Sequence, residues 1–157
     1  MASSIISYKS NFFWAGDSLL TVVVYYLLPL IRKSKGRCQK DDEEWFDNYL
    51  LEFELILKGL SMDNVDFDLD NLALSPCRLK IFLEKLVEVK DFFLEKEAIS
   101  VAELKAIEDI RLGEKQYFKN PVRSEVFIKI IDDIVFLLSS DTGTGTGTDP
   151  AGADLAI

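Results

Sequence analysis

The sequence contains no histidine in its 157 residues. Without imidazole the chain cannot build a Ser-His-Asp or Cys-His triad, and it lacks the commonest zinc ligand and the usual general base at neutral pH. A phosphate-binding loop is also missing, because Gly143-Thr144-Gly145 is followed by no Lys-Ser or Lys-Thr pair. We therefore expect a protein that is not an enzyme and that needs no cofactor.

Cysteine is scarce as well. Cys38 and Cys77 are the two cysteines, and they show no CxxC spacing. A disulfide framework usually needs more cysteines in a much shorter secreted chain. One bridge between them is the alternative, but we expect two free thiols in a reducing cytoplasm.

A long apolar run is missing too. The uninterrupted apolar part, Leu19–Ile31, is thirteen residues long and includes Thr21 and Pro29, whereas a bilayer span needs about twenty. The basic residues follow this run, which is the wrong order for a signal peptide. Val22 to Tyr26 favour a strand, but the length and the Asp17-Ser18 cap favour a helix. We expect a buried helix, with a membrane anchor over residues 12–31 as the alternative.

Helical periodicity is present throughout the rest of the chain. The first apolar stripe ends near Gly59, and three later segments begin at Ser75-Pro76, at the capping box of Ser100 and Glu103, and at Asn120-Pro121. The first stripe consists of Phe46, Tyr49, Leu50, Phe53, Ile56, Leu57 and Leu60. We expect Phe46, Tyr49, Leu50, Phe53 and Leu57 to be buried in the core. The pattern predicts an all-α fold, a compact bundle of about five helices.

Composition divides the chain into three parts. Residues 1–40 form an apolar and then basic segment that we expect to pack on the domain, and residues 41–140 form the helical domain core. Residues 141–157 alternate Thr with Gly and then continue in small residues, which predicts a flexible C-terminal tail, either functional or introduced by cloning.

Acidic residues are concentrated in one stretch. Residues 41–72 hold eleven carboxylates against one base, Lys58, for a net charge of −10, while the whole chain carries −9. The first forty residues carry +5. Because phosphate contacts need Lys and Arg, an isoelectric point near 4.6 argues against direct binding of nucleic acid.

The acidic stretch predicts a surface that binds a basic protein partner. Aromatic residues beside the acids, Phe46 and Tyr49 among them, are expected to supply buried contacts. The residues predicted to bind the partner are Asp41, Asp42, Glu43, Glu44, Trp45, Asp47, Asp63, Asp66, Phe67, Asp68 and Asp70. The first four acids also suit a helix start, where the macrodipole favours negative charge.

The chain resembles bacterial immunity proteins that neutralise nuclease toxins, such as those of colicin and contact-dependent growth-inhibition systems. The resemblance lies in size, acidity and helicity over about residues 41–138, and no residue role is carried over from it. It implies a cytoplasmic protein that inhibits a cognate toxin by occluding its active site or an adjacent exosite.

Other interpretations of the charged residues stay open. Asp66, Asp68 and Asp70 resemble the opening of an EF-hand loop, but Asn71 replaces the glycine and Cys77 the bidentate glutamate, so we expect no metal. Asp132-Asp133 could serve a carboxylate enzyme, although we expect solvated surface charge. The basic segment 32–37 could touch anionic lipid or RNA, or pair with acids of the chain itself. A membrane-associated or scaffold protein is the alternative function.

Overall fold

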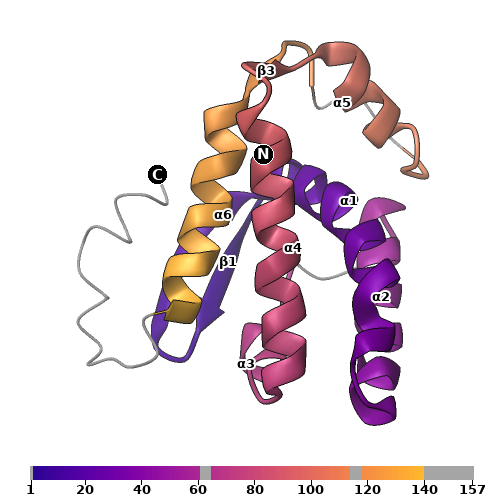
Figure 1. The fold of residues 1–157 in the computed structure, drawn as a ribbon. Helices are drawn as coiled ribbons and strands as arrows, with labels where there is room; N and C mark the ends of the chain where they lie inside the picture. The colour runs from indigo at the N-terminus through magenta and orange to yellow at the C-terminus, as the bar shows by residue number, and fades with distance from the viewer. Residues whose placement is uncertain (1, 61–64, 114–117, 140–157) are drawn as a thin grey trace.

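The computed structural model describes residues 2–60, 65–113 and 118–139 (Figure 1). In these residues 66% of the chain is helical, in six α-helices, and the strands form two small antiparallel sheets. The prediction of a mostly helical fold is confirmed, but the prediction of a purely all-α fold is wrong. The tail 141–157 lies outside the described residues.

The chain starts with a β-hairpin that the sequence prediction missed. Strands β1 (Ser3–Tyr8) and β2 (Asn11–Gly16) pair in register from Ser3 opposite Gly16 to Tyr8 opposite Asn11. Burial alternates along both strands. One face of the hairpin packs on the core, and the other exposes Ile5, Phe12 and Trp14.

Helix α1 (Asp17–Ser34) begins directly after the hairpin and is central to the core. Its apolar residues Val22–Val24 and Leu27 are fully buried, which confirms the buried helix. Asp17 suits the first turn because its charge faces the positive end of the macrodipole, and it accepts a hydrogen bond from Ser4 Oγ at 2.5 Å. Among the described residues, no helix combines the length and the apolar character needed to cross a membrane.

A 3₁₀ turn, η1 (Lys35–Arg37), connects α1 to α2 (Lys40–Leu57). The five residues of the stripe that were expected in the core are each at most 6% exposed. Leu60, the last position of the predicted stripe, lies after the end of α2 and is 50% exposed, so its assignment to the buried face is wrong. The helix ends just before Gly59, whose positive φ of 72° is the left-handed conformation expected after a helix. The apolar spacing therefore predicted this element correctly.

Helices α3 (Leu69–Leu72) and α4 (Pro76–Leu94) follow. Ser75 caps α4 as predicted, because its side chain accepts a hydrogen bond from the Arg78 backbone N–H. The phenol of Tyr49 on α2 donates to the carbonyl oxygen of Phe67 at 2.5 Å, which holds the segment before α3 against α2.

The last part of the chain contains β3 (Ala98–Ile99), α5 (Val101–Glu108), β4 (Val122–Arg123) and α6 (Ser124–Ser139). The capping box of Ser100 is present at the start of α5. Asn120-Pro121, by contrast, does not start a helix. It precedes β4, which pairs with β3, and the helix begins only at Ser124.

The helices and the hairpin form the layers of one core (Figure 1). Helices α4 and α6 lie side by side, with the rings of Phe93 and Phe127 stacked at 4.9 Å between them, and the hairpin covers the other side of α6. The short sheet β3–β4 and α5 lie at one end of the molecule, and α3 lies at the other.

Candidate functional site

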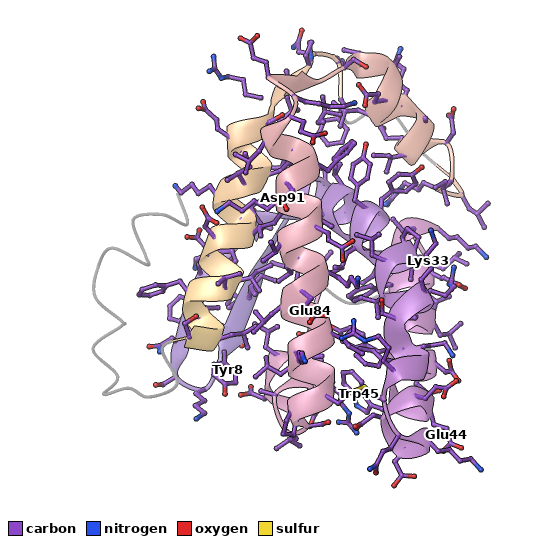
Figure 2. All side chains as sticks on the ribbon, in the orientation of Figure 1. Tyr8, Lys33, Glu44, Trp45, Glu84 and Asp91 are labelled. Atoms are coloured by element: carbon purple, nitrogen blue, oxygen red, sulfur yellow. A yellow bond between two sulfur atoms is a disulfide. The ribbon has the colours of Figure 1, made fainter. Side chains whose placement is uncertain are left out.

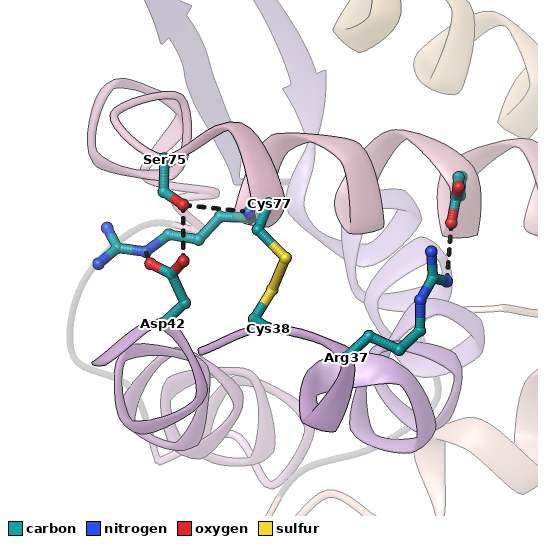
Figure 3. The surroundings of a disulfide bond; sticks show 7 residues. Arg37, Cys38, Asp42, Ser75 and Cys77 are labelled. Atoms are coloured by element: carbon teal, nitrogen blue, oxygen red, sulfur yellow. Dashed lines mark hydrogen bonds and ion pairs between the residues drawn. A yellow bond between two sulfur atoms is a disulfide. The ribbon is translucent and has the colours of Figure 1, made fainter. Parts of the chain in front are cut away.

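The start of α2 places the first predicted acids next to cations of the same chain. Asp42 accepts hydrogen bonds from Arg78 Nε and from Ser75 Oγ, both at 2.8 Å (Figure 3). Lys35 Nζ lies 2.8 Å from Asp47 Oδ1 and 3.4 Å from Glu43 Oε1. The carboxylate of Asp47, with that of Glu43, raises the pKa of Lys35.

The basic segment at the end of α1 is engaged in the same way. Arg32 pairs with Glu54, and Arg37 pairs with Glu84 at 2.9 Å. The Arg37 guanidinium lowers the pKa of Glu84. The segment therefore pairs with acids of the chain, which is one of the two alternatives that the sequence left open.

Asp66, Asp68 and Asp70 form a second acidic group around the start of α3. Asp66 Oδ1 accepts a hydrogen bond from the Asp68 backbone N–H at 2.7 Å, and Asp70 Oδ1 accepts one from the Lys9 backbone N–H at 3.0 Å. The side-chain amide of Asn71 donates to both oxygens of Asp68. Partial burial and the neighbouring carboxylates raise the pKa of Asp68 against the effect of Asn71. Asp68 serves mainly to shape this turn, while Asp66 and Asp70 are exposed.

The aromatic residues predicted as partner contacts lie inside the molecule. Phe67 is 1% exposed, and Phe46 and Tyr49 belong to the same core. Trp45 is partly covered, because it stacks on Tyr49 and carries the Arg78 guanidinium 4.4 Å from its ring centre. The placement of Phe67 on a binding surface is therefore wrong. Its ring fills the space between α2 and α4, as contacts with Phe53 and Phe82 show.

Five of the predicted acids are exposed: Asp41, Glu44, Asp47, Asp66 and Asp70. The start of α2 and α3 lie at the same end of the molecule, where Figure 2 labels Glu44 and Trp45. We call these five carboxylates the acidic face. Asp63 lies outside the described residues. Leu74, between α3 and α4, is 75% exposed, and the sequence prediction did not single it out.

A disulfide joins Cys38, before α2, to Cys77, at the start of α4 (Figure 3). The two Cα atoms are 6.0 Å apart. The prediction of two free thiols is wrong, because the fold brings together two cysteines that are 39 residues apart in sequence. Asp42 lies close to both sulfur atoms, but the bridged sulfurs are not thiolates and Asp42 is held by Arg78, so these three side chains do not form a metal site in this state.

Two further acids, Glu108 and Asp133, lie in concave places, and sequence reasoning did not single out Glu108. A cavity of about 210 Å³ between α1, α2 and α5 is lined by Asp17, Glu108 and Arg111, and Glu108 accepts a hydrogen bond from the Phe118 backbone N–H at 3.1 Å. Glu108 follows Leu104 by one helical turn, and this position on the apolar stripe was the available signal.

Asp133 is the second, and the prediction that it is solvated is wrong. Its neighbour Asp132 is exposed and pairs with Lys90 at 2.7 Å, whereas Asp133 is 5% exposed and lines a groove between α6 and β2. The two carboxylates point in different directions, as neighbours on a helix must.

Comparisons with protein-family models, with curated proteins and with solved structures found no match for this chain.

Proposed function

We propose that this chain is a non-catalytic binding protein whose acidic face engages a basic protein partner, as immunity proteins do when they neutralise nuclease toxins. One observation carries the proposal. Asp41, Asp66 and Asp70 are exposed at one end of the molecule, and no ion pair joins them to a cation within the described residues. Glu44 and Asp47 extend the face. Their partners, Lys40 and Lys35, are themselves surface residues that a stronger cation can replace.

A nuclease toxin suits this surface because its cleft is built to hold phosphates. Carboxylates at the end of a rigid helical domain can occupy such a cleft by charge complementarity and accelerate the encounter. Charge alone adds little affinity after desolvation, so an apolar contact is also required. Leu74 supplies it in place of Phe67, since Leu74 follows Asp70 by four residues and is 75% exposed.

Residues outside the acidic face hold in place the helices that carry it. Asp42, Ser75 and Arg78 connect α2 to α4 behind the exposed acids, and Tyr49 fixes the segment before α3. The acidic face is therefore preorganised, which reduces the entropy lost on binding.

Charge reversal tests the proposal. The face variant carries Asp41→Lys, Glu44→Lys and Asp66→Lys. The control variant carries Asp91→Lys, Glu95→Lys and Glu97→Lys, which are exposed acids toward the other end of α4 (Figure 2 labels Asp91), and it changes the net charge equally. The probe is a purified nuclease with a basic active-site cleft, and the association rate is measured from low to high salt.

We expect the face variant to associate at least about tenfold more slowly at low salt and to lose most of its salt dependence, because steering requires unscreened charge near the contact. The control variant should keep both. If the association rate fell equally in the two variants, net charge and not the acidic face would determine the rate. If neither variant changed binding, the partner would have to contact other helices.

A cytoplasmic location belongs to the same proposal. A reducing cytoplasm favours the open, dithiol form of Cys38 and Cys77. The acidic face does not contain either cysteine, so we expect binding to survive reduction of the bridge.

The alternative of a membrane anchor over residues 12–31 has less support. Its most apolar part is committed to the core, since Val22–Val24 and Leu27 are fully buried in α1.

A further inference from the structure

An open groove of about 610 Å³ separates β2 from α6. Phe13, Trp14 and Ala15 of β2 form one wall, and Val126 and Ile130 of α6 form the other. Gly16 and Leu19 close the groove at the start of α1. This size and this apolar lining are typical of a small-molecule site.

The carboxyl group of Asp133 lies in this groove. Asp133 is 5% exposed, and neither a hydrogen bond nor an ion pair holds its side chain within the described residues. Its oxygens keep some access to solvent through the open groove, but a largely covered carboxylate without a protein partner gives up part of its hydration for no hydrogen bond in return, which favours a ligand cation. Asp132, one residue earlier, has the exposure and the lysine partner that a structural acid usually has.

The other charges around Asp133 all come from α6. Glu125 and Lys129 line the groove one turn apart, and Asp132 adds a negative charge nearby. The lining residues of β2 and α1 carry no charge. Among the charged residues that line the groove, Asp133 is therefore the least exposed to solvent. Lys129 lies nearby, but no ion pair joins it to Asp133 in the described part of the chain.

We propose that this groove binds a small apolar molecule that carries a primary ammonium group, with Asp133 as the acceptor of its charged hydrogen bond. The apolar body lies between β2 and α6. An anion is disfavoured by Asp133 and Glu125, and a neutral molecule offers the carboxylate at most a hydrogen bond from an uncharged donor, which is weaker than one from an ammonium group.

The site is independent of the proposed function. The groove lies between the hairpin and α6, whereas the acidic face belongs to α2 and α3. Loss of one activity by mutation should therefore leave the other intact, and the two proposals fail separately.

Protonation of Asp133 gives the site a pH dependence. Burial raises the pKa of Asp133 to about 6, with an added rise from Asp132 and an opposing effect of Lys129. An alkyl ammonium group stays charged well above this pH, because its pKa resembles that of lysine at about 10. Binding of such a cation should strengthen as the pH rises from about 5 to 8 and Asp133 becomes a carboxylate.

The test uses phenethylamine, with 2-phenylethanol as the neutral molecule of the same shape and 3-phenylpropionate as the anion. Each is titrated into the ¹⁵N-labelled full chain, and chemical shifts of the Trp14 indole and of residues 125–133 are followed. We expect phenethylamine to bind at least about tenfold more tightly than 2-phenylethanol, the gain of a charge-assisted hydrogen bond. The anion should bind most weakly.

Variants locate the contact. Asp133→Asn should reduce phenethylamine affinity at least about tenfold and abolish its pH dependence. Asp132→Asn should keep the affinity and a pH dependence, with the midpoint at a slightly lower pH because Asp132 no longer raises the pKa of Asp133. Lys129→Gln, a change at a partly exposed residue that leaves the core intact, should strengthen binding because it removes a competing cation. Equal binding of the amine and the alcohol, full affinity in Asp133→Asn, or weaker binding in Lys129→Gln would each overturn the proposal.

Discussion

At the scale of the residue, Phe53 shows how a single side chain supports both the core and the acidic end. Its ring is fully buried and lies 4.7 Å from the ring of Tyr49 and 5.8 Å from that of Phe67. Removing it leaves a cavity between α2 and the segment before α3.

We predict that Phe53→Ala lowers the free energy of unfolding by about 3–5 kcal/mol, because the transfer term and the cavity term add. Urea denaturation followed by circular dichroism measures the change. A loss below about 1 kcal/mol would mean that α2 does not pack on the core as described.

Asp133 gives a second prediction at this scale, on stability against pH. Its pKa in the folded protein is about 6, above the value near 3.9 of an unfolded chain. Between about pH 3.9 and pH 6, Asp133 is therefore protonated more fully in the folded state than in the unfolded chain. The free energy of unfolding falls as the pH rises through this window, and the loss is complete above about pH 6.

Asp133→Asn should therefore stabilise the protein at pH 7.5, on the order of 1–2 kcal/mol after allowance for solvent in the open groove, and have little effect near pH 4. Denaturation of both proteins at the two pH values measures this. If Asp133→Asn stabilised the protein equally at both pH values, the ionised carboxylate would not be the cause of the stabilisation.

At the scale of the element, the disulfide ties the start of α2 to the start of α4. It closes a loop across 39 residues, and a cross-link of this span stabilises mainly by restricting the unfolded chain. We predict that the double variant Cys38→Ser/Cys77→Ser loses about 3–4 kcal/mol of stability relative to the oxidised protein. The reduced wild type should match the variant in thermal unfolding. A reduced protein as stable as the oxidised one would show that the bridge adds nothing.

The elements also show which features a sequence can predict. The stripe of α2, the Ser75 cap and the Ser100 capping box depend on residues of one helix and its cap, within about three turns of one another, and these features were predicted correctly. The hairpin was not. Lys9-Ser10 is no standard hairpin turn, and both faces of β1 carry an isoleucine, so the alternation of polar and apolar residues is missing.

The site was predictable only in outline, for the same reason. Exposure of the acids depends on partners far along the chain, such as Arg78 for Asp42 and Lys9 for Asp70. The burial of Phe67 depends on packing between three segments. Composition located the acidic stretch but could not separate its exposed members from those that serve the fold.

At the scale of the whole molecule, charge is distributed unevenly over one core. The net charge of −9 includes acids outside the acidic face, such as Glu54 and Glu84, that pair with the basic segment 32–37, and acids of the face that have no such pair among the described residues, such as Asp41 and Asp66. Association with a basic partner should therefore depend on the acidic face more than on the total charge, which is what the matched reversals at the two ends of the molecule distinguish.

The bridge between Cys38 and Cys77 also makes residues 38–77 a closed covalent ring that contains all of α2 and α3. A single protease cut inside this ring leaves the oxidised protein as one molecule, whereas a cut outside it releases a fragment. We predict that a protein nicked between residues 39 and 76 runs as one band without reductant and as two bands with it. After such a cut the acidic face stays covalently attached to the core, at the high effective concentration of a tethered segment. It can separate from the core only after a second cut inside the ring or after reduction of the disulfide.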